Sequence, residues 1–293
     1  MTGRFDAKKI AYLDSNKISA FIRTALDEDI GPGDYSSLAA IDNSAEGQAD
    51  LIIKEPGVLA GLEVALQVFS TIDPILKIRT FFNDGDLVQP GDLVLSVHGK
   101  AQTILSAERL ALNILQRMSG IATKTARMVK LIGHTNCQLL DTRKTTPNFR
   151  MFEKWAVLIG GGTNHRFALY DMIMLKDNHI DYSGGITKAV ANTRAYLKTN
   201  SLDLRIEVET RTLAEVETAL EAGADIILLD NMNLEELKQA VQLVGGRVKT
   251  EASGGITETT IGPIAETGVD FISVGALTHS YKSLDMSLKA SIA

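Results

Sequence analysis

Hydrophobic residues follow two different patterns along this chain of 293 residues. From about residue 47 to residue 99 they form short β-like runs, and turn sequences such as NDGD and QPGD separate these runs. Few helices are predicted before residue 99, and their apolar spacing lies at residues 16–26 and 64–70. We therefore predict a small, strand-rich N-terminal module.

The turns of this module are similar to those of biotinyl or lipoyl carrier modules. No lysine stands at a hairpin tip between paired small residues or methionines, so a carrier function is not expected.

A long helix is predicted to follow this module. Ser106 is a suitable N-cap residue, so the helix is expected to begin there. Leu110, Ile114, Met118 and Ile121 are spaced as one apolar face of such a helix. The helix would link the N-terminal module to the rest of the chain.

Beyond the helix, short apolar runs alternate with helical segments, and the connections between them are short. This alternation is typical of right-handed βαβ units that build a parallel sheet. Two of the helices carry their own start signals, because Thr212 with Glu215 and Asn233 with Glu236 form capping-box sequences. The six predicted strands are residues 138–141, 172–175, 204–209, 225–229, 248–252 and 271–274.

Polar residues and glycines follow these strands directly. The carboxyl ends of parallel strands meet at one edge of a sheet, and in a (β/α) barrel that edge carries the active site. Six strands are fewer than the eight of a standard barrel. We therefore predict an α/β fold with an incomplete barrel, closed by the N-terminal module or by another subunit. The residues at the strand ends are Arg143 and Lys144, Lys176, Glu209, Asp230, Ser253–Gly255 and Gly275.

A cluster of basic residues stands out because the protein is acidic, with a formal net charge of −6. The negative net charge argues against binding to nucleic acid or to anionic membranes, since both require a basic surface. The cluster could consist of solvated surface charges, which is the usual situation of charged side chains. Its position at strand ends instead favours a site for a small anion. Its members are Arg143, Lys144, His165, Arg166 and Lys176.

Cysteine and histidine positions limit the chemistry further. Cys137 is the only cysteine, which excludes a disulfide within the chain and a site of several thiolates; we expect a buried structural thiol. His98, His134, His179 and His279 show no HxH or HExxH spacing, so no catalytic zinc site is expected. The N-terminal segment lacks an apolar signal region, and no 18 uncharged apolar residues run together, so we expect a cytoplasmic protein.

Acidic residues alternate with apolar ones in the predicted strand 204–209. Arg205, Glu207 and Glu209 share one face of it, and one of the two faces must look into the barrel. An inward charged face is costly unless a cation or a hydroxyl-rich ligand meets it. Glu209, with Asp230 after the next strand, is therefore a candidate Mg²⁺ or ribose site. The alternative is that Glu207 and Glu209 pair with arginines, and the pattern does not decide which of them faces the site.

Three glycine-containing sequences could bring backbone N–H groups to a ligand. Gly160–Gly162 precede His165 and could supply such donors. The run is equally consistent with a helix end that is followed by a flexible loop. Ser253–Gly255 and Val274–Ala276 follow two neighbouring strands, where glycine lets backbone donors crowd around a phosphate. We predict a phosphate site at these two strand ends.

Longer motifs together resemble the quinolinate phosphoribosyltransferase family, also called nicotinate-nucleotide pyrophosphorylase (carboxylating), over nearly the whole chain. They are EDIGPGDYSS from Glu28, ERLALNILQRMSGIAT from Glu108, DTRKTTP from Asp141, GGGTNHRFALYDMIMLKDNHI from Gly160, IEVET from Ile206, LLDNM from Leu228, EASGGI from Glu251 and ETGVDFISVGALTHS from Glu266. The resemblance implies an N-terminal α/β sandwich domain over residues 1–121, joined by residues 277–293. It also implies an incomplete six-stranded α/β barrel with the active site over residues 122–276, and a homodimer with sites near the subunit boundary.

The resemblance implies transfer of phosphoribosyl from phosphoribosyl pyrophosphate to quinolinate with decarboxylation, giving nicotinate mononucleotide, pyrophosphate and CO₂ in NAD biosynthesis. Matched by motif, the residues for quinolinate are Arg143, His165, Arg166 and Lys176, with Arg109 reaching in from the partner subunit. Those for phosphoribosyl pyrophosphate are Thr142, Lys144, Ser253, Gly254, Gly255, Val274, Gly275 and Ala276. Those for the ribose hydroxyls and Mg²⁺ are Glu209 and Asp230. The implied catalytic residues are Lys144, Lys176, Glu209 and Asp230.

Departures from the family pattern do not remove any of these residues. Asn148 and Phe149 stand where Gly-Leu is expected, Trp155 where tyrosine is frequent, and Ala168 where glycine is common. Asn148 can still adopt a positive φ. We therefore expect altered loop kinetics in preference to a lost activity.

Three other functions remain open for this sequence. One is a related pyrophosphorylase on the same scaffold that acts on a different small acid. Another is a barrel aldolase with Lys176 as a Schiff base, which borohydride trapping with a carbonyl substrate would reveal. The third is a non-catalytic protein that binds quinolinate.

Overall fold

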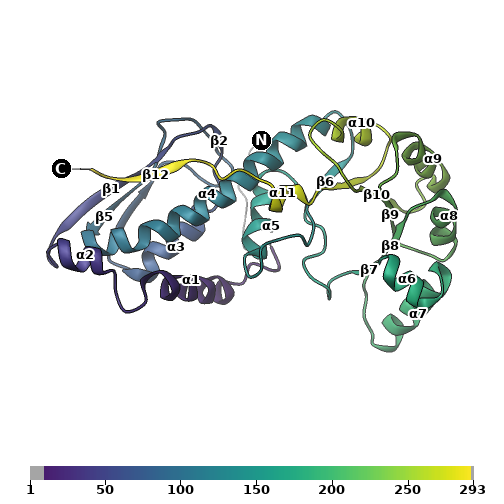
Figure 1. The fold of residues 1–293 in the computed structure, drawn as a ribbon, viewed down its shortest axis with the longest axis horizontal. Coiled ribbons are helices and arrows are strands. Elements are labelled where there is room, and N and C mark those ends of the chain that lie inside the picture. Colours follow the sequence, from purple (N-terminus) through teal and green to yellow (C-terminus); the bar gives the residue numbers. More distant parts are fainter. Residues whose placement is uncertain (1–9, 292–293) are drawn as a thin grey trace. The chain divides into compact units, whose positions relative to one another are not determined.

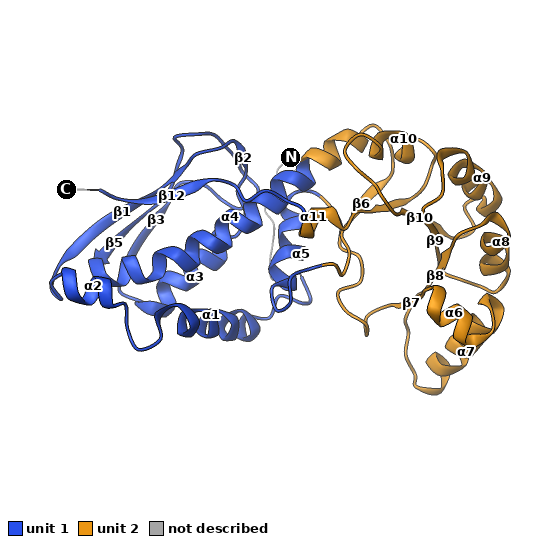
Figure 2. Ribbon diagram, in the orientation of Figure 1, with its two compact units in different colours: residues 1–126, 145–161, 280–293 blue, residues 127–144, 162–279 orange. Residues whose placement is uncertain are grey.

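The computed structural model describes residues 10–291, and the chain forms two compact units (Figures 1 and 2). Unit 1 comprises residues 1–126, 145–161 and 280–293, and unit 2 comprises residues 127–144 and 162–279. The first nine residues, on which the expected cellular location partly rests, lie outside the described residues. Among the residues that are described, none of the helices is long and apolar enough to span a membrane.

Unit 1 is built on a four-stranded antiparallel sheet with the order β12-β1-β5-β3. In β1, Ala49, Leu51 and Ile53 are buried while the residues between them are more exposed, as period-2 alternation requires. Residues from the C-terminal end complete the sheet, because Leu288 lies opposite Leu51. The strands of unit 1 are β1 (Glu46–Ile53), β3 (Lys77–Thr80), β5 (Leu93–Lys100) and β12 (Met286–Ser291), with a separate pair β2 (Gly57–Val58) and β4 (Leu87–Val88).

The helices of unit 1 are α1 (Ser15–Ile30), α2 (Tyr35–Ala40), α3 (Leu62–Ile72), α5 (Arg150–Ile159) and most of α4 (Ala101–Ile132). The predicted start of α4 at Ser106 is wrong. Strand β5 runs directly into the helix at Ala101, so no loop with a capping residue precedes it. Ser106 lies in the second turn, where its hydroxyl donates to the carbonyl oxygen of Gln102 at 3.0 Å.

Helix α5 packs with unit 1, whereas the sequence-based boundaries include its residues in the barrel. The helix is buried over most of its surface, and the ring of Phe152 lies 4.8 Å from that of Phe21 in α1. At its C-terminal end, a Cβ on Gly160 would lie 2.5 Å from the carbonyl oxygen of Ala122, so only glycine fits there. The glycine run therefore ends a helix, one of its two expected roles. Before α5, Asn148 has the expected positive φ, 63°.

A buried ion pair ties the residues before α5 to α4. Glu153 is fully buried, and its carboxylate accepts from Nε of Arg117 at 3.0 Å and from the backbone N–H of Thr146 at 3.1 Å. Replacing Glu153 with leucine is expected to lower the free energy of unfolding by about 3–5 kcal/mol, because the guanidinium is left without its carboxylate. Urea denaturation measures the loss. Glu55→Gln, which breaks the more exposed pair with Lys282, is the control and should cost no more than about 1 kcal/mol. Equally small losses in the two variants would contradict a strongly stabilising ion pair between Glu153 and Arg117.

Unit 2 is a six-stranded sheet with the order β6-β11-β10-β9-β8-β7, and every neighbouring pair is parallel. All six predicted strands are present, with boundaries shifted by one or two residues. In the described chain, β6 and β7 form the two edges and do not pair with each other, so the barrel is incomplete as expected. The strands are β6 (Gln138–Leu140), β7 (Ile173–Leu175), β8 (Ile206–Thr210), β9 (Ile226–Asp230), β10 (Lys249–Ser253) and β11 (Phe271–Ser273).

Figure 1 shows these strands curving around a common centre, with helices α7 to α10 on the outer side. The capping box at Asn233 and Glu236 is complete, whereas the one at Thr212 is partial because the Glu215 carboxylate accepts from the backbone of Arg211 instead. The helices of unit 2 are α6 (Asp177–Ser183), α7 (Ile186–Thr199), α8 (Leu213–Glu221), α9 (Leu234–Val244), α10 (Ile261–Ala265) and α11 (Ala276–His279).

Candidate active site

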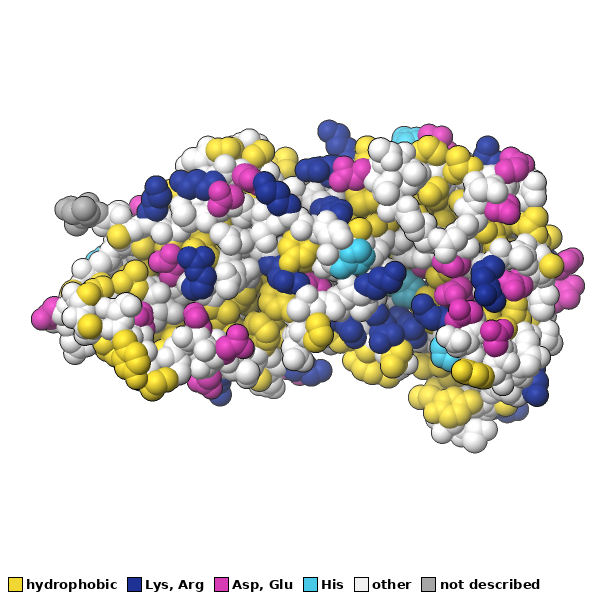
Figure 3. Space-filling view, viewed as in Figure 1, with side chains coloured by type: hydrophobic (Ala, Val, Ile, Leu, Met, Phe, Trp, Pro, Cys, Tyr) yellow, Lys and Arg dark blue, Asp and Glu magenta, His cyan; other side chains and the backbone are white. Residues whose placement is uncertain are grey.

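A cavity of about 740 Å³ opens at the carboxyl ends of the six parallel strands of unit 2. Figure 3 shows basic side chains beside acidic ones on this face of the unit. Every site residue expected from the sequence lines the cavity except Arg109, which is exposed on α4 in unit 1. The lining residues are Thr142, Arg143, Lys144, His165, Arg166, Lys176, Glu209, Asp230, Ser253, Gly254, Gly255, Val274, Gly275 and Ala276, together with others that the sequence did not indicate.

The strand ends explain how residues far apart in the sequence come together. Asp141, fully buried just after β6, accepts a hydrogen bond from the side chain of Asn164 at 2.6 Å and from the backbone N–H of His165 at 2.9 Å. This carboxylate therefore fixes the loop that carries His165 and Arg166 against the end of β6. Lys176 follows β7 directly and is the N-cap residue of α6.

One side of the cavity is cationic. Arg166 is half-buried, and both burial and the nearby guanidinium of Arg143 lower its pKa. One nitrogen of Arg166 donates to the carbonyl oxygen of Met172 at 3.1 Å, which sets its direction. Two guanidinium groups held close together repel each other until an anion lies between them. This side of the cavity is therefore prepared for a carboxylate or a phosphate.

The opposite side offers backbone donors and one further histidine. A Cβ on Gly275 would lie 3.0 Å from Cδ of Lys144 and 3.1 Å from Nε2 of His279, so any side chain here would crowd both residues. Thr278 fixes the backbone here by donating to the carbonyl oxygen of Lys144 at 2.8 Å. His279 lines the cavity, which its sequence spacing did not indicate. Its position four residues after Gly275, one helical turn, is the signal that could have found it.

The carboxylates of Glu209 and Asp230 lie between these sides of the cavity. Glu209 and Asp230 both line it, while Glu207 is fully buried below, so Glu209 is the residue that faces the site. Burial raises the pKa of Glu209, Lys176 at 3.7 Å lowers it, and Asp230 raises it again. A divalent cation would relieve this repulsion. Two carboxylates suit Mg²⁺, which prefers oxygen ligands and keeps several waters or phosphate oxygens.

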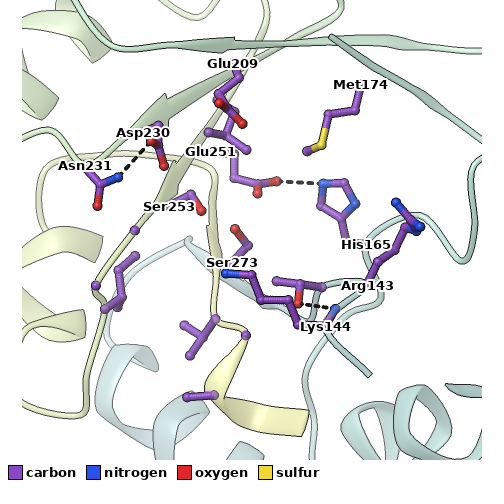
Figure 4. A pocket seen from close by; sticks show the side chains of 18 of the residues that line it. Arg143, Lys144, His165, Met174, Glu209, Asp230, Asn231, Glu251, Ser253 and Ser273 are labelled. Atoms are coloured by element: carbon purple, nitrogen blue, oxygen red, sulfur yellow. Dashed lines mark hydrogen bonds and ion pairs between the residues drawn. The ribbon is translucent and has the colours of Figure 1, made fainter. Parts of the chain in front are cut away.

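Two lining residues, His165 and Glu251, form a cluster with the fully buried Glu207, and this cluster was not predicted. Nε2 of His165 is 2.9 Å from the carboxylate of Glu207. It is also 3.4 Å from the carboxylate of Glu251, a pair that Figure 4 marks with a dashed line. Nδ1 accepts a hydrogen bond from the backbone N–H of Arg166 at 2.7 Å. Glu207 therefore pairs with a histidine and not with an arginine. In this arrangement both ring nitrogens of His165 face groups of the protein, so the histidine holds the Arg166 loop in place.

The cluster keeps a proton that the unfolded chain would release. Burial alone would lower the pKa of His165, but hydrogen bonds to Glu207 and Glu251 raise it to about 9. Burial, followed by the charge of Glu251, raises the pKa of Glu207 to about 7. Since Nδ1 accepts the Arg166 N–H, the protons of the cluster lie between Nε2 and the two carboxylates.

Stability is expected to fall as the pH rises from 7 to 9. The pKa of His165 is higher in the folded chain, about 9 against its usual 6.5, so its contribution is fully present below pH 6.5 and is lost as the pH passes 9. The total loss is on the order of 3 kcal/mol at most. Urea midpoints measured across this range should decline in the wild type and in His134→Gln, which changes an exposed histidine. His165→Gln should remove most of the slope. An identical slope in His165→Gln would contradict the account.

Comparison with known proteins gives matches across both units. Two family models match the chain: "Quinolinate phosphoribosyl transferase, N-terminal domain" over residues 34–119 and "Quinolinate phosphoribosyl transferase, C-terminal domain" over residues 121–289. A protein of Oryza sativa subsp. japonica named "Nicotinate-nucleotide pyrophosphorylase (carboxylating), chloroplastic" is 48% identical over 288 residues, which cover 93% of this chain and 77% of that protein. The probable nicotinate-nucleotide pyrophosphorylase (carboxylating) of Bacillus subtilis (strain 168) is 42% identical, with 90% of each chain covered. Among solved structures, NadC from Streptococcus pyogenes is 46% identical with a TM-score of 0.91, covering 95% of this chain and 98% of that one.

Proposed function

The chain belongs to the quinolinate phosphoribosyl transferase family and is a phosphoribosyltransferase of NAD biosynthesis, and we propose that the cavity of unit 2 holds quinolinate beside phosphoribosyl pyrophosphate. The observation that carries the proposal is the pairing of a cationic side with a glycine-rich side in one cavity, with two carboxylates between them. A pyridine dicarboxylate needs the cationic side, and a sugar phosphate needs the backbone donors of the glycine-rich side. The ribose between them needs the two carboxylates.

Quinolinate is proposed to bind at the cationic side. Arg143, Arg166 and Lys176 bring three positive charges to a ligand with two carboxylates, and the two guanidinium groups can each form paired hydrogen bonds. His165 supports this site through the Arg166 backbone. Arg109 belongs to unit 1 and does not line the cavity of unit 2, and we propose that it reaches the site from the partner subunit of a homodimer.

Phosphoribosyl pyrophosphate is proposed to lie across the other side. The backbone at Ser253–Gly255 and Val274–Ala276 would take the 5-phosphate, and Lys144 with Thr142 would meet the pyrophosphate. Glu209 and Asp230 would hold the ribose hydroxyls and Mg²⁺, directly or through water. When bound, the ion would neutralise charge on the pyrophosphate. The proposed cellular location is the cytoplasm, although the rice relative is named as chloroplastic.

The reaction needs charges of both signs at fixed places. As the bond from C1 to the pyrophosphate oxygen breaks, the ribose ring becomes positive and the leaving group takes both electrons. Glu209 and Asp230 stabilise the sugar, and Lys144 stabilises the pyrophosphate. The quinolinate nitrogen bonds to C1 and becomes cationic. It can then accept the electrons of the C–C bond when the adjacent carboxylate leaves as CO₂, and the ring carbon takes up a proton. The side chains thus act mainly by holding the two substrates in line.

The test combines purified protein with phosphoribosyl pyrophosphate, Mg²⁺ and quinolinate labelled in the carboxylate next to the ring nitrogen. We expect labelled CO₂, nicotinate mononucleotide and pyrophosphate in equal amounts, and a strongly reduced rate in Lys144→Ala. Nicotinate as the better substrate would indicate a related pyrophosphorylase. Quinolinate binding without pyrophosphate release would indicate a non-catalytic binding protein. Either result would overturn the proposal.

A further inference from the structure

Asn231 also lines the cavity, beside the carboxylate of Asp230. It follows Asp230 at the end of β9, and its φ of 54° lies in the left-handed region, which few residues other than glycine adopt. A strained conformation at the edge of a substrate cavity requires a compensating interaction. The neighbours of its side chain supply one.

The carboxamide of Asn231 joins the two halves of the proposed donor site. Its Nδ2 donates to Oδ2 of Asp230 at 2.8 Å, a bond that Figure 4 marks with a dashed line. Asp230 can only accept when ionised, so the amide nitrogen must face it and Oδ1 must face the other way. That other side is Gly254, where a Cβ would lie 2.1 Å from Oδ1. The backbone N–H of Asn231 also donates to the carbonyl oxygen of Ser253 at 2.9 Å.

We infer that Asn231 is a positioning residue for phosphoribosyl pyrophosphate, an inference that rests on the proposed function. Its amide occupies one oxygen of Asp230, which leaves Oδ1 of that carboxylate to meet a ribose hydroxyl or the hydrated cation. The same amide lies against the Cα of Gly254 and keeps the backbone donors of residues 253–255 in place for the 5-phosphate. One side chain thereby fixes the separation between the ribose end and the phosphate end of the donor.

A simpler explanation is that Asn231 is present only because asparagine tolerates the left-handed conformation. Glycine adopts that conformation without strain. Asn231→Gly therefore keeps the backbone and removes the amide, so the two explanations predict opposite results for it. Asn231→Asp keeps the shape and the tolerance for this conformation, but places a second carboxylate against Asp230 where the donor had been.

The experiment measures binding of phosphoribosyl pyrophosphate by calorimetry with and without Mg²⁺, together with KM for each substrate and kcat. We expect Asn231→Gly and Asn231→Asp each to raise Kd and KM for phosphoribosyl pyrophosphate at least tenfold. KM for quinolinate should change less than threefold, and thermal stability should stay within the range of Ser201→Gly. That control relieves another positive φ, 53°, at a residue that does not line the cavity.

Either variant binding phosphoribosyl pyrophosphate as the wild type does would overturn the inference while leaving the proposed function intact. A parallel rise in KM for quinolinate would also overturn it, since that result indicates a general loss of structure. A wild type that neither binds phosphoribosyl pyrophosphate nor releases CO₂ would overturn the inference and the proposed function together.

Discussion

Arg143→Ala is expected to lower kcat/KM for quinolinate by about a thousandfold, because hydrogen bonds between charged groups contribute about 1.5–3 kcal/mol each and two are lost. KM for phosphoribosyl pyrophosphate should change much less, since Arg143 belongs to the cationic side of the cavity. Steady-state kinetics with each substrate varied in turn gives both values. Arg143→Lys should fall between the wild type and alanine, because lysine keeps the charge but cannot form two parallel bonds to one carboxylate.

The matched control for this prediction is Arg127→Ala. Arg127 lies in the same unit, and it pairs with the exposed Glu258. That variant should retain wild-type kinetics. If Arg143→Ala affected both substrates equally, or affected neither, the assignment of quinolinate to the cationic side would be wrong.

Glu209→Gln is expected to lower kcat by about a hundredfold to a thousandfold, with a smaller effect on the binding of quinolinate. The substitution keeps the size and polarity of the side chain and removes the negative charge that would stabilise the ribose as the bond to pyrophosphate breaks. It also leaves Lys176 without its carboxylate at 3.7 Å. Single-turnover measurements with saturating substrates separate this effect on chemistry from any effect on binding.

Glu209→Gln should also raise the Mg²⁺ concentration needed for half-maximal rate, because it removes one of the two carboxylates proposed to hold the ion. Glu258→Gln, which changes an exposed carboxylate that does not line the cavity, is the matched charge control. An unchanged kcat and an unchanged Mg²⁺ requirement in Glu209→Gln would contradict the role given to this residue.

Local sequence patterns were sufficient for the sheet of unit 2. Each of its strands is a short apolar run bounded by turn residues, and such runs are governed by burial within a few residues of chain. The polar residues at their ends then followed from parallel geometry alone. Lys176 and Glu209 could be assigned to one edge of the sheet because each directly follows, or ends, an apolar strand.

Features that depend on contacts between distant residues were not accessible in this way. The direction of His165 depends on Asp141, more than twenty residues away, and its partners Glu207 and Glu251 come from two other strands. The start of α4 depends on β5 continuing into it, and capping rules do not describe such a junction. Helix α5 follows β6 as a barrel helix would, yet it packs in unit 1, where the ring of Phe152 lies against that of Phe21 in α1.

The most direct test of the central claim is a crystal structure of the protein with quinolinate and a non-hydrolysable analogue of phosphoribosyl pyrophosphate. We expect the two quinolinate carboxylates to contact Arg143, Arg166 and Lys176, and the 5-phosphate to lie on the backbone of Ser253–Gly255. Quinolinate bound away from these three cations, or bound with the side chains turned outward from the cavity, would contradict that claim.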